Sequence, residues 1–260
     1  MSNIITNVSY FTPSRYVSGR IVEYDIKSAN ISMLKRFNKI DDNYYNYLKN
    51  LPKIDREIEI GLMIKNNKTI YDTIRDGIKI YKQKLVEANN IDDSKIVRIA
   101  NDAVYINSPL DLQYTVFDNI IEFKQKAIYN VATKLGNAII FSSFNLNGEM
   151  NMDIIGLGKN SIYHQNYMAS FIGTVIYMIE KSELSEAFKY IDEFIEHYLK
   201  LELDIQYYRE FNSGSLFSIK DSPYKITSCN DLSQIDIGYN FYIIGELRNI
   251  LVQLYNIRRN

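Results

Sequence analysis

The sequence of 260 residues has no tryptophan, one cysteine, two histidines and four prolines. A single thiol, Cys229, excludes an intramolecular disulfide. With His164 and His197 as the only histidines, a zinc site built from cysteine and histidine is almost excluded as well. A bound metal ion would therefore have to be held by carboxylates.

Neither sign of charge is in excess. Thirty basic residues stand against 31 acidic residues, which gives a formal net charge of −1 and a pI near 6.2. The chain as a whole is therefore not attracted to nucleic acid or to an anionic membrane, and a nucleic-acid role would depend on local groups of cations. The hydrophobic content of 46% is enough for a sizeable core.

Long apolar runs are also missing. The most apolar stretch, Met168 to Ile179, is about half the roughly 20 residues that cross a bilayer, so it predicts a buried helix. The first residues lack the basic and then apolar order of a secretory signal. We expect no membrane association and a cytoplasmic location. Abundant Asn, Ile, Lys and Tyr are typical of an AT-rich gene of a phage or low-GC bacterium, in which case the cytoplasm is that of the host.

The hydrophobic pattern changes near residue 158. Before it, the spacing predicts a strand over 20–25, helices over 28–37 and 68–89, a hairpin over 95–107 and mainly strands over 112–155. After it, three segments have helical periodicity. We expect an α+β fold with an α+β region over 1–158 and a helical region over 159–260, which can also form one continuous domain.

Two acidic residues stand at informative places. Asp25 ends the first predicted strand, where it runs into a helix, and Asp102 lies at the tip of the hairpin. Such residues are usually helix caps or turn residues, and the alternative is a shared metal site. The sequence of residues 25–32, DIKSANIS, favours the metal site because it resembles motif A of the family B DNA polymerases. Asp25, Ser28 and Ser32 match that motif in register.

Three further segments resemble the same family, in the same order. Residues 102–106 are similar to the second half of motif C, although Ala100 stands where the family has another aspartate. Lys126 and Tyr129 match an element that contacts primer and template, and residues 152–157 are similar to the strand that follows it. Residues 98–102 also resemble a reverse transcriptase motif, with Asn101 in place of one aspartate. The resemblance to family B DNA polymerases and the resemblance to reverse transcriptases both indicate a polymerase palm.

The resemblance implies a palm-like antiparallel sheet with packed helices and a helical C-terminal part in place of a thumb. It further implies a nucleotidyltransferase that adds nucleotides, with or without a template, by two-metal catalysis. Its partners would be nucleic acid and a nucleoside triphosphate, and its cofactor Mg²⁺ or Mn²⁺. The residues implied are Asp25 and Asp102 as catalytic metal ligands, Ile26, Ser28 and Asn30 at the nucleotide, and Lys126 and Tyr129 at the nucleic acid.

Other features depart from a working polymerase. The span between Asp25 and Asp102 is much shorter than the fingers that the family inserts there, and the family's motif B is missing. The nearest cations for a triphosphate are Lys65, Lys68 and Arg75. Asn30 replaces the tyrosine that excludes the ribose 2′-hydroxyl in the family. Three alternatives therefore stay open: a partner protein that supplies fingers, an inactive palm-derived module that binds nucleic acid or protein, and an unrelated α+β domain.

Overall fold

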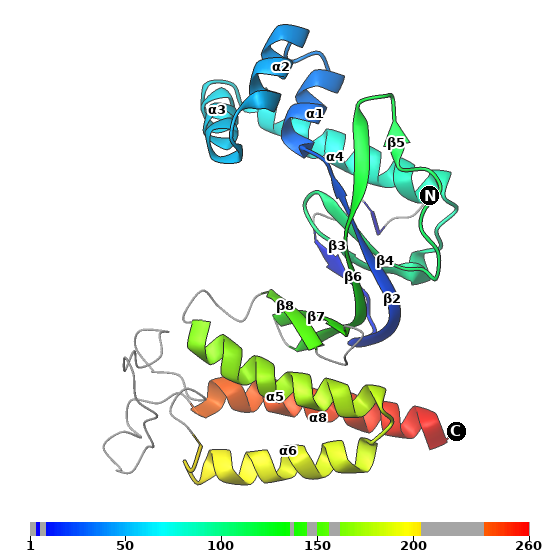
Figure 1. Ribbon diagram of the computed structural model, residues 1–260, viewed down its shortest axis with the longest axis vertical. Helices are drawn as coiled ribbons and strands as arrows, with labels where there is room; N and C mark the ends of the chain where they lie inside the picture. Colours follow the sequence, from blue (N-terminus) through cyan, green and yellow to red (C-terminus); the bar gives the residue numbers. More distant parts are fainter. Residues whose placement is uncertain are drawn as a thin grey trace. The chain divides into compact units, whose positions relative to one another are not determined.

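The computed structural model describes residues 4–5, 9–135, 138–144, 150–155, 162–203 and 237–259. The chain forms two compact units. Unit 1 comprises Met1–Ser14 and Ser18–Asn130, and unit 2 comprises Arg15–Val17 and Val131–Asn260. Strands pair in antiparallel fashion in both units, and helices accompany them (Figure 1). The predicted α+β class is confirmed.

The sheet of unit 1 contains the two acidic positions. Its strands follow one another in the order β1 (Tyr10–Phe11), β3 (Ile96–Ile99), β4 (Ala103–Asn107), β2 (Tyr16–Ile26) and β6 (Ile121–Leu135). A short strand, β5 (Val116–Phe117), pairs with β6. Strand β2 has the continuous buried run Ile21–Tyr24, as expected for a central strand that is covered on both faces. Strands β2 and β6 both continue into unit 2.

Four helices lie between β2 and β3 in the chain: α1 (Ala29–Arg36), α2 (Asp42–Asn50), α3 (Lys53–Asn66) and α4 (Lys68–Ala88). The apolar face that predicts α4 is confirmed by its buried residues, among them Ile70, Ile74, Ile78, Tyr81 and Leu85. The sequence did not predict α2 and α3. Each buries a single residue, Leu48 and Ile60 respectively, so neither shows the apolar stripe by which a helix is normally found.

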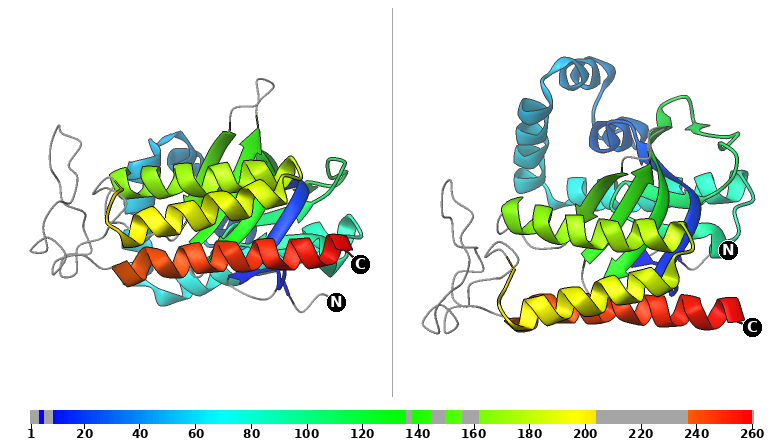
Figure 2. Two further views of the ribbon diagram at one scale, coloured as in Figure 1. Left: turned by 90° about the horizontal axis from the view of Figure 1, so that it is seen from below. Right: turned by 60° about the horizontal axis from the view of Figure 1, so that its bottom comes forward.

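Unit 2 combines sheet and helices. Its strands β7 (Ala138–Phe144) and β8 (Met150–Ile155) extend the sheet from β6. The helices α5 (Ile162–Glu180), α6 (Leu184–Leu199) and α8 (Ile237–Arg259) lie along one another (Figure 2). Their apolar faces share one core with β6 and β7. None of the helices within the described ranges is long and apolar enough to cross a membrane.

Candidate functional site

Asp25 and Asp102 belong to neighbouring strands of unit 1. Asp25 lies one residue before the end of β2, directly opposite Ala103, the first residue of β4. The amide of Ile26 donates to the carbonyl oxygen of Asp102 at 3.0 Å. This backbone bond fixes the tip of the β3–β4 hairpin beside the end of β2. Two acidic residues that are far apart in the sequence therefore share one edge of the sheet.

The carboxylate of Asp25 is in an unfavourable environment for a charge. Its side chain is 18% exposed, and its Oδ1 is buried with no hydrogen-bond partner. Burial raises the pKa of Asp25, and the negative charge of Asp102 raises it further, whereas Lys126 lowers it. A cation that bound both carboxylates would relieve the repulsion and the desolvation together.

A second buried carboxylate, Glu23, lies two residues before Asp25 on the same strand. Glu23 is 3% exposed and accepts hydrogen bonds from Lys126 Nζ at 2.9 Å and from the hydroxyl of Tyr129 at 3.2 Å. The Lys126 ammonium lies 3.9 Å from Asp25 Oδ2, and its bond to Glu23 raises the pKa of Lys126. Sequence reasoning missed Glu23, although strand alternation places it on the face of Asp25.

Of the two residues predicted to contact nucleic acid, one is open to solvent. The side chain of Lys126 is 55% exposed, so it can reach a phosphate. Tyr129 is buried, and its ring stacks on that of Tyr105. Lys126 and Tyr129 both donate to the carboxylate of Glu23, so Tyr129 helps to hold the partner of the Lys126 ammonium in place.

The residues predicted to surround a nucleotide lie at the start of α1. Ser28 precedes α1 in a left-handed backbone conformation, with φ of 49°, and its side chain makes no capping bond. The amides of the first turn of a helix have no partner within the helix, so this end of α1 favours an anion. The amide of Ile26, whose backbone was also predicted to lie at the nucleotide, donates within the sheet to Asp102. Asn30 donates from Nδ2 to Glu57 on α3 at 2.9 Å.

A pocket of about 240 Å³ lies beside these residues, between α1, α4 and the β3–β4 turn. Its cations are Arg75, Lys79 and Lys82 of α4. Lys65 and Lys68, which the sequence also suggested for a triphosphate, do not line it. The remaining lining residues are Asn30, Tyr71, Ile74, Ile78 and Asn101. Sequence reasoning missed Lys79 and Lys82, although spacings of four and three residues place them on one helical face with Arg75.

The carboxylate oxygens of Asp25 and Asp102 are the kind of ligand that a magnesium or manganese ion prefers. Both metals prefer oxygen donors, and Mg²⁺ is commonly held by one or two carboxylates together with water and substrate phosphates. The buried, unpartnered Oδ1 of Asp25 is an oxygen that a cation would satisfy. Within the described residues, no group of three or more His, Cys, Asp or Glu side chains is arranged to hold a metal. The site therefore offers two carboxylates at most.

Comparison with known proteins defines the family. The family described as "Bacteriophage PBS1 gene 130 protein" matches residues 7–258. The chain belongs to this family. The family description agrees with the phage origin that the composition indicated. No curated protein matches the chain.

Among solved structures, the chain is similar to the family B DNA polymerase from the hyperthermophilic archaeon Pyrobaculum calidifontis. The TM-score is 0.51 at 11% sequence identity, over 94% of this chain and 47% of the polymerase chain. The gene 130 family member thus spans about half the length of that polymerase. At this identity the similarity shows the fold alone, so the chain has a polymerase-like fold.

Proposed function

We propose that the protein is a metal-dependent nucleotidyltransferase that adds nucleotides to a 3′-hydroxyl, with or without a template. The observation that carries this proposal is the placement of Asp25, at the end of β2, beside Asp102, at the tip of the β3–β4 hairpin, next to the cationic pocket of α4. The polymerase-like fold supports it.

Each part of the site has a role in this proposal. Asp25 and Asp102 would hold Mg²⁺ or Mn²⁺, which when bound would neutralise the triphosphate and activate the attacking hydroxyl. The start of α1 at Ser28, together with Arg75 and Lys79, would bind the triphosphate. Asn30, which lines the same pocket, would contact the nucleoside, and the exposed ammonium of Lys126 would hold the nucleic-acid backbone.

A second candidate is a palm-derived binding module without catalysis. The position of Lys126 favours it, because its ammonium already neutralises Glu23 and lies 3.9 Å from Asp25, where a metal would compete with it. In this case the chain would bind nucleic acid or a protein. A partner protein that supplies fingers is compatible with either candidate, since the chain covers only 47% of the similar polymerase.

The test compares the wild type with Asp25→Asn and Asp102→Asn. Mn²⁺ binding is measured by calorimetry with and without a nucleoside triphosphate, and nucleotide addition is measured on a labelled primer. We expect triphosphate-enhanced Mn²⁺ binding and primer extension in the wild type, and loss of both in the two variants. The matched control is Asp111→Asn, which removes an exposed carboxylate that pairs with Arg20 in the same unit. It is expected to behave as the wild type.

Two results would contradict the nucleotidyltransferase. Turnover that persists in Asp102→Ala would show that the carboxylate pair does not carry the reaction. Nucleic-acid binding without Mn²⁺ binding or primer extension in the wild type would favour the binding module instead.

A further inference from the structure

Lys82 is the most deeply buried cation of unit 1 among the residues described. It lies on α4, and only 1% of its surface is exposed. Burial lowers the pKa of Lys82 to about 8, and the carboxylate of Asp102 opposes this shift. An ammonium is rarely kept away from water unless its donors are used, so its hydrogen bonds indicate its role.

The ammonium of Lys82 holds the backbone of the β3–β4 turn. Its Nζ donates to the carbonyl oxygen of Ala100 at 2.9 Å and to that of Asn101 at 3.1 Å. The next carbonyl, that of Asp102, accepts from the amide of Ile26 on β2. Three consecutive carbonyls are therefore fixed, two by a side chain of α4 and one by the neighbouring strand. The peptide planes on both sides of Asn101, and with them the direction of Asp102, are defined by these bonds.

We propose that Lys82 is a positioning residue that aims the carboxylate of Asp102 at Asp25 by holding the carbonyls of Ala100 and Asn101. This inference rests on the proposed metal site. Because Lys82 also lines the cationic pocket, an anion bound there would lie close to the group that orders the turn. Occupation of the pocket and metal binding by Asp102 are then coupled through one side chain.

The direction in which the Mn²⁺ affinity changes in Lys82→Met distinguishes a positioning role of Lys82 from a simple effect of its charge. Lys82 is a cation close to Asp102, so its positive charge alone opposes the binding of a metal cation. If only charge mattered, Lys82→Met would bind Mn²⁺ more tightly than the wild type. If Lys82 orders the turn, the same variant binds Mn²⁺ more weakly, because the Asp102 carboxylate is no longer held in place.

The experiment titrates Mn²⁺ alone into the full-length chain and follows the free ion by electron paramagnetic resonance. We expect Lys82→Met to weaken binding about 10-fold or more, as loss of an outer-shell partner of a metal ligand typically does. Lys82→Arg keeps donors for the two carbonyls and is expected to restore most of the affinity. Lys79→Met is the matched control, because Lys79 lines the same pocket while the turn carbonyls accept from Lys82 and Ile26. It should bind Mn²⁺ slightly more tightly.

Hydrogen exchange of residues 100–103 distinguishes failure of this inference from failure of the proposed function. We expect faster exchange of this turn in Lys82→Met than in Lys82→Arg, whether or not Mn²⁺ binds. If the wild type binds no Mn²⁺, the metal site is wrong, and faster exchange in Lys82→Met would still show that Lys82 holds the turn. Unchanged exchange, or tighter Mn²⁺ binding by a folded Lys82→Met, would overturn the inference. Lys82→Gln replaces Lys82→Met if the latter does not fold.

Discussion

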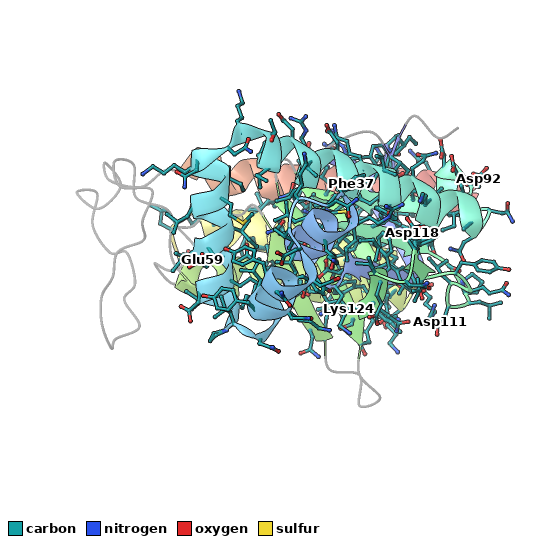
Figure 3. All side chains as sticks on the ribbon, turned by 90° about the horizontal axis from the view of Figure 1, so that it is seen from above. Phe37, Glu59, Asp92, Asp111, Asp118 and Lys124 are labelled. Atoms are coloured by element: carbon teal, nitrogen blue, oxygen red, sulfur yellow. The ribbon has the colours of Figure 1, made fainter. Side chains whose placement is uncertain are left out.

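A single carboxylate, that of Asp118, connects two helices of unit 1 with the β5–β6 turn. Asp118 is labelled among the side chains in Figure 3. It accepts hydrogen bonds from Arg36 Nε on α1 at 2.7 Å, from the hydroxyl of Tyr81 on α4, and from Lys84 Nζ at 3.3 Å. Asp118 and Asn119 both have left-handed backbone conformations, which asparagine and aspartate tolerate in tight turns. The hydrogen bonds from Tyr81 and Arg36 hold the pKa of Asp118 well below its usual range.

We expect Asp118→Asn to lower the free energy of unfolding by about 1 kcal/mol at pH 7, since the charge is partly screened by solvent. Asparagine keeps the left-handed conformation and one acceptor oxygen, so the variant removes the charge without changing the backbone of the turn. Because the folded-state pKa lies below the unfolded value of about 3.9, the stabilisation is present above that pH and is lost as the pH falls. Urea unfolding at pH 7 and pH 3 should therefore show a smaller difference from wild type at pH 3.

The control for this prediction is Asp76→Asn. Asp76 pairs with Arg75 on the exposed face of α4, and we expect its loss to leave the urea midpoint close to that of the wild type at both pH values, because an exposed ion pair contributes little to stability. A difference between wild type and Asp118→Asn that stays constant from pH 7 to pH 3 would contradict the assigned role of the Asp118 charge.

At the scale of elements, the contact between α1 and α4 places Asn30 and the cations of α4 around one pocket. The helices approach closely at Gly77. A Cβ atom there would lie 2.6 Å from Cε2 of Phe37 and 2.9 Å from the sulfur of Met33. A side chain at position 77 would therefore push α1 away from α4.

We expect Gly77→Ala to destabilise unit 1 by about 1–2 kcal/mol, because overpacking outweighs the better helix propensity of alanine. Gly61 provides a matched comparison on α3, since a Cβ there meets nothing within 4 Å. Gly61→Ala is expected to stabilise by roughly 0.5–1 kcal/mol. Thermal unfolding followed by circular dichroism measures both, and equal shifts of the two variants would show that the close approach at Gly77 has no cost.

At the scale of the whole molecule, the buried apolar side chains of the described residues form two hydrophobic cores. One, in unit 1, gathers side chains from β2, β3, β4 and helices α1 to α4, and includes the fully buried Leu34. The other, in unit 2, gathers α5, α6, α8 and the strands β6 and β7, and includes the fully buried Leu247. Each unit thus has the core that a cooperatively folding body requires.

We expect calorimetry to resolve two unfolding transitions. Leu34→Ala should lower the midpoint of one and Leu247→Ala that of the other, each by the equivalent of about 2–5 kcal/mol. A single transition that both substitutions shift equally would show that the two cores unfold as one.

The sequence by itself determined much of the fold. The apolar spacing along α4, the hairpin with Asp102 at its tip and the switch to helices in the C-terminal part are local patterns, and each is visible because one face of the element is buried. The local sequence of residues 25–32 likewise identified Asp25, Ser28 and Asn30 as candidate site residues. Helices α2 and α3 were not predicted. Each buries only one residue, so the spacing of their hydrophobic residues does not follow a helical period.

Only the tertiary structure decided which side chains share one environment. Glu23 and Lys82 are ordinary charged residues in the sequence, and neither belongs to a recognisable motif. Their importance comes from burial together with hydrogen bonds to Lys126 and Tyr129 in one case and to the carbonyls of the β3–β4 turn in the other. These partners are distant in the chain, and the cost of leaving a buried charge unpaired arises only once strands and helices have packed.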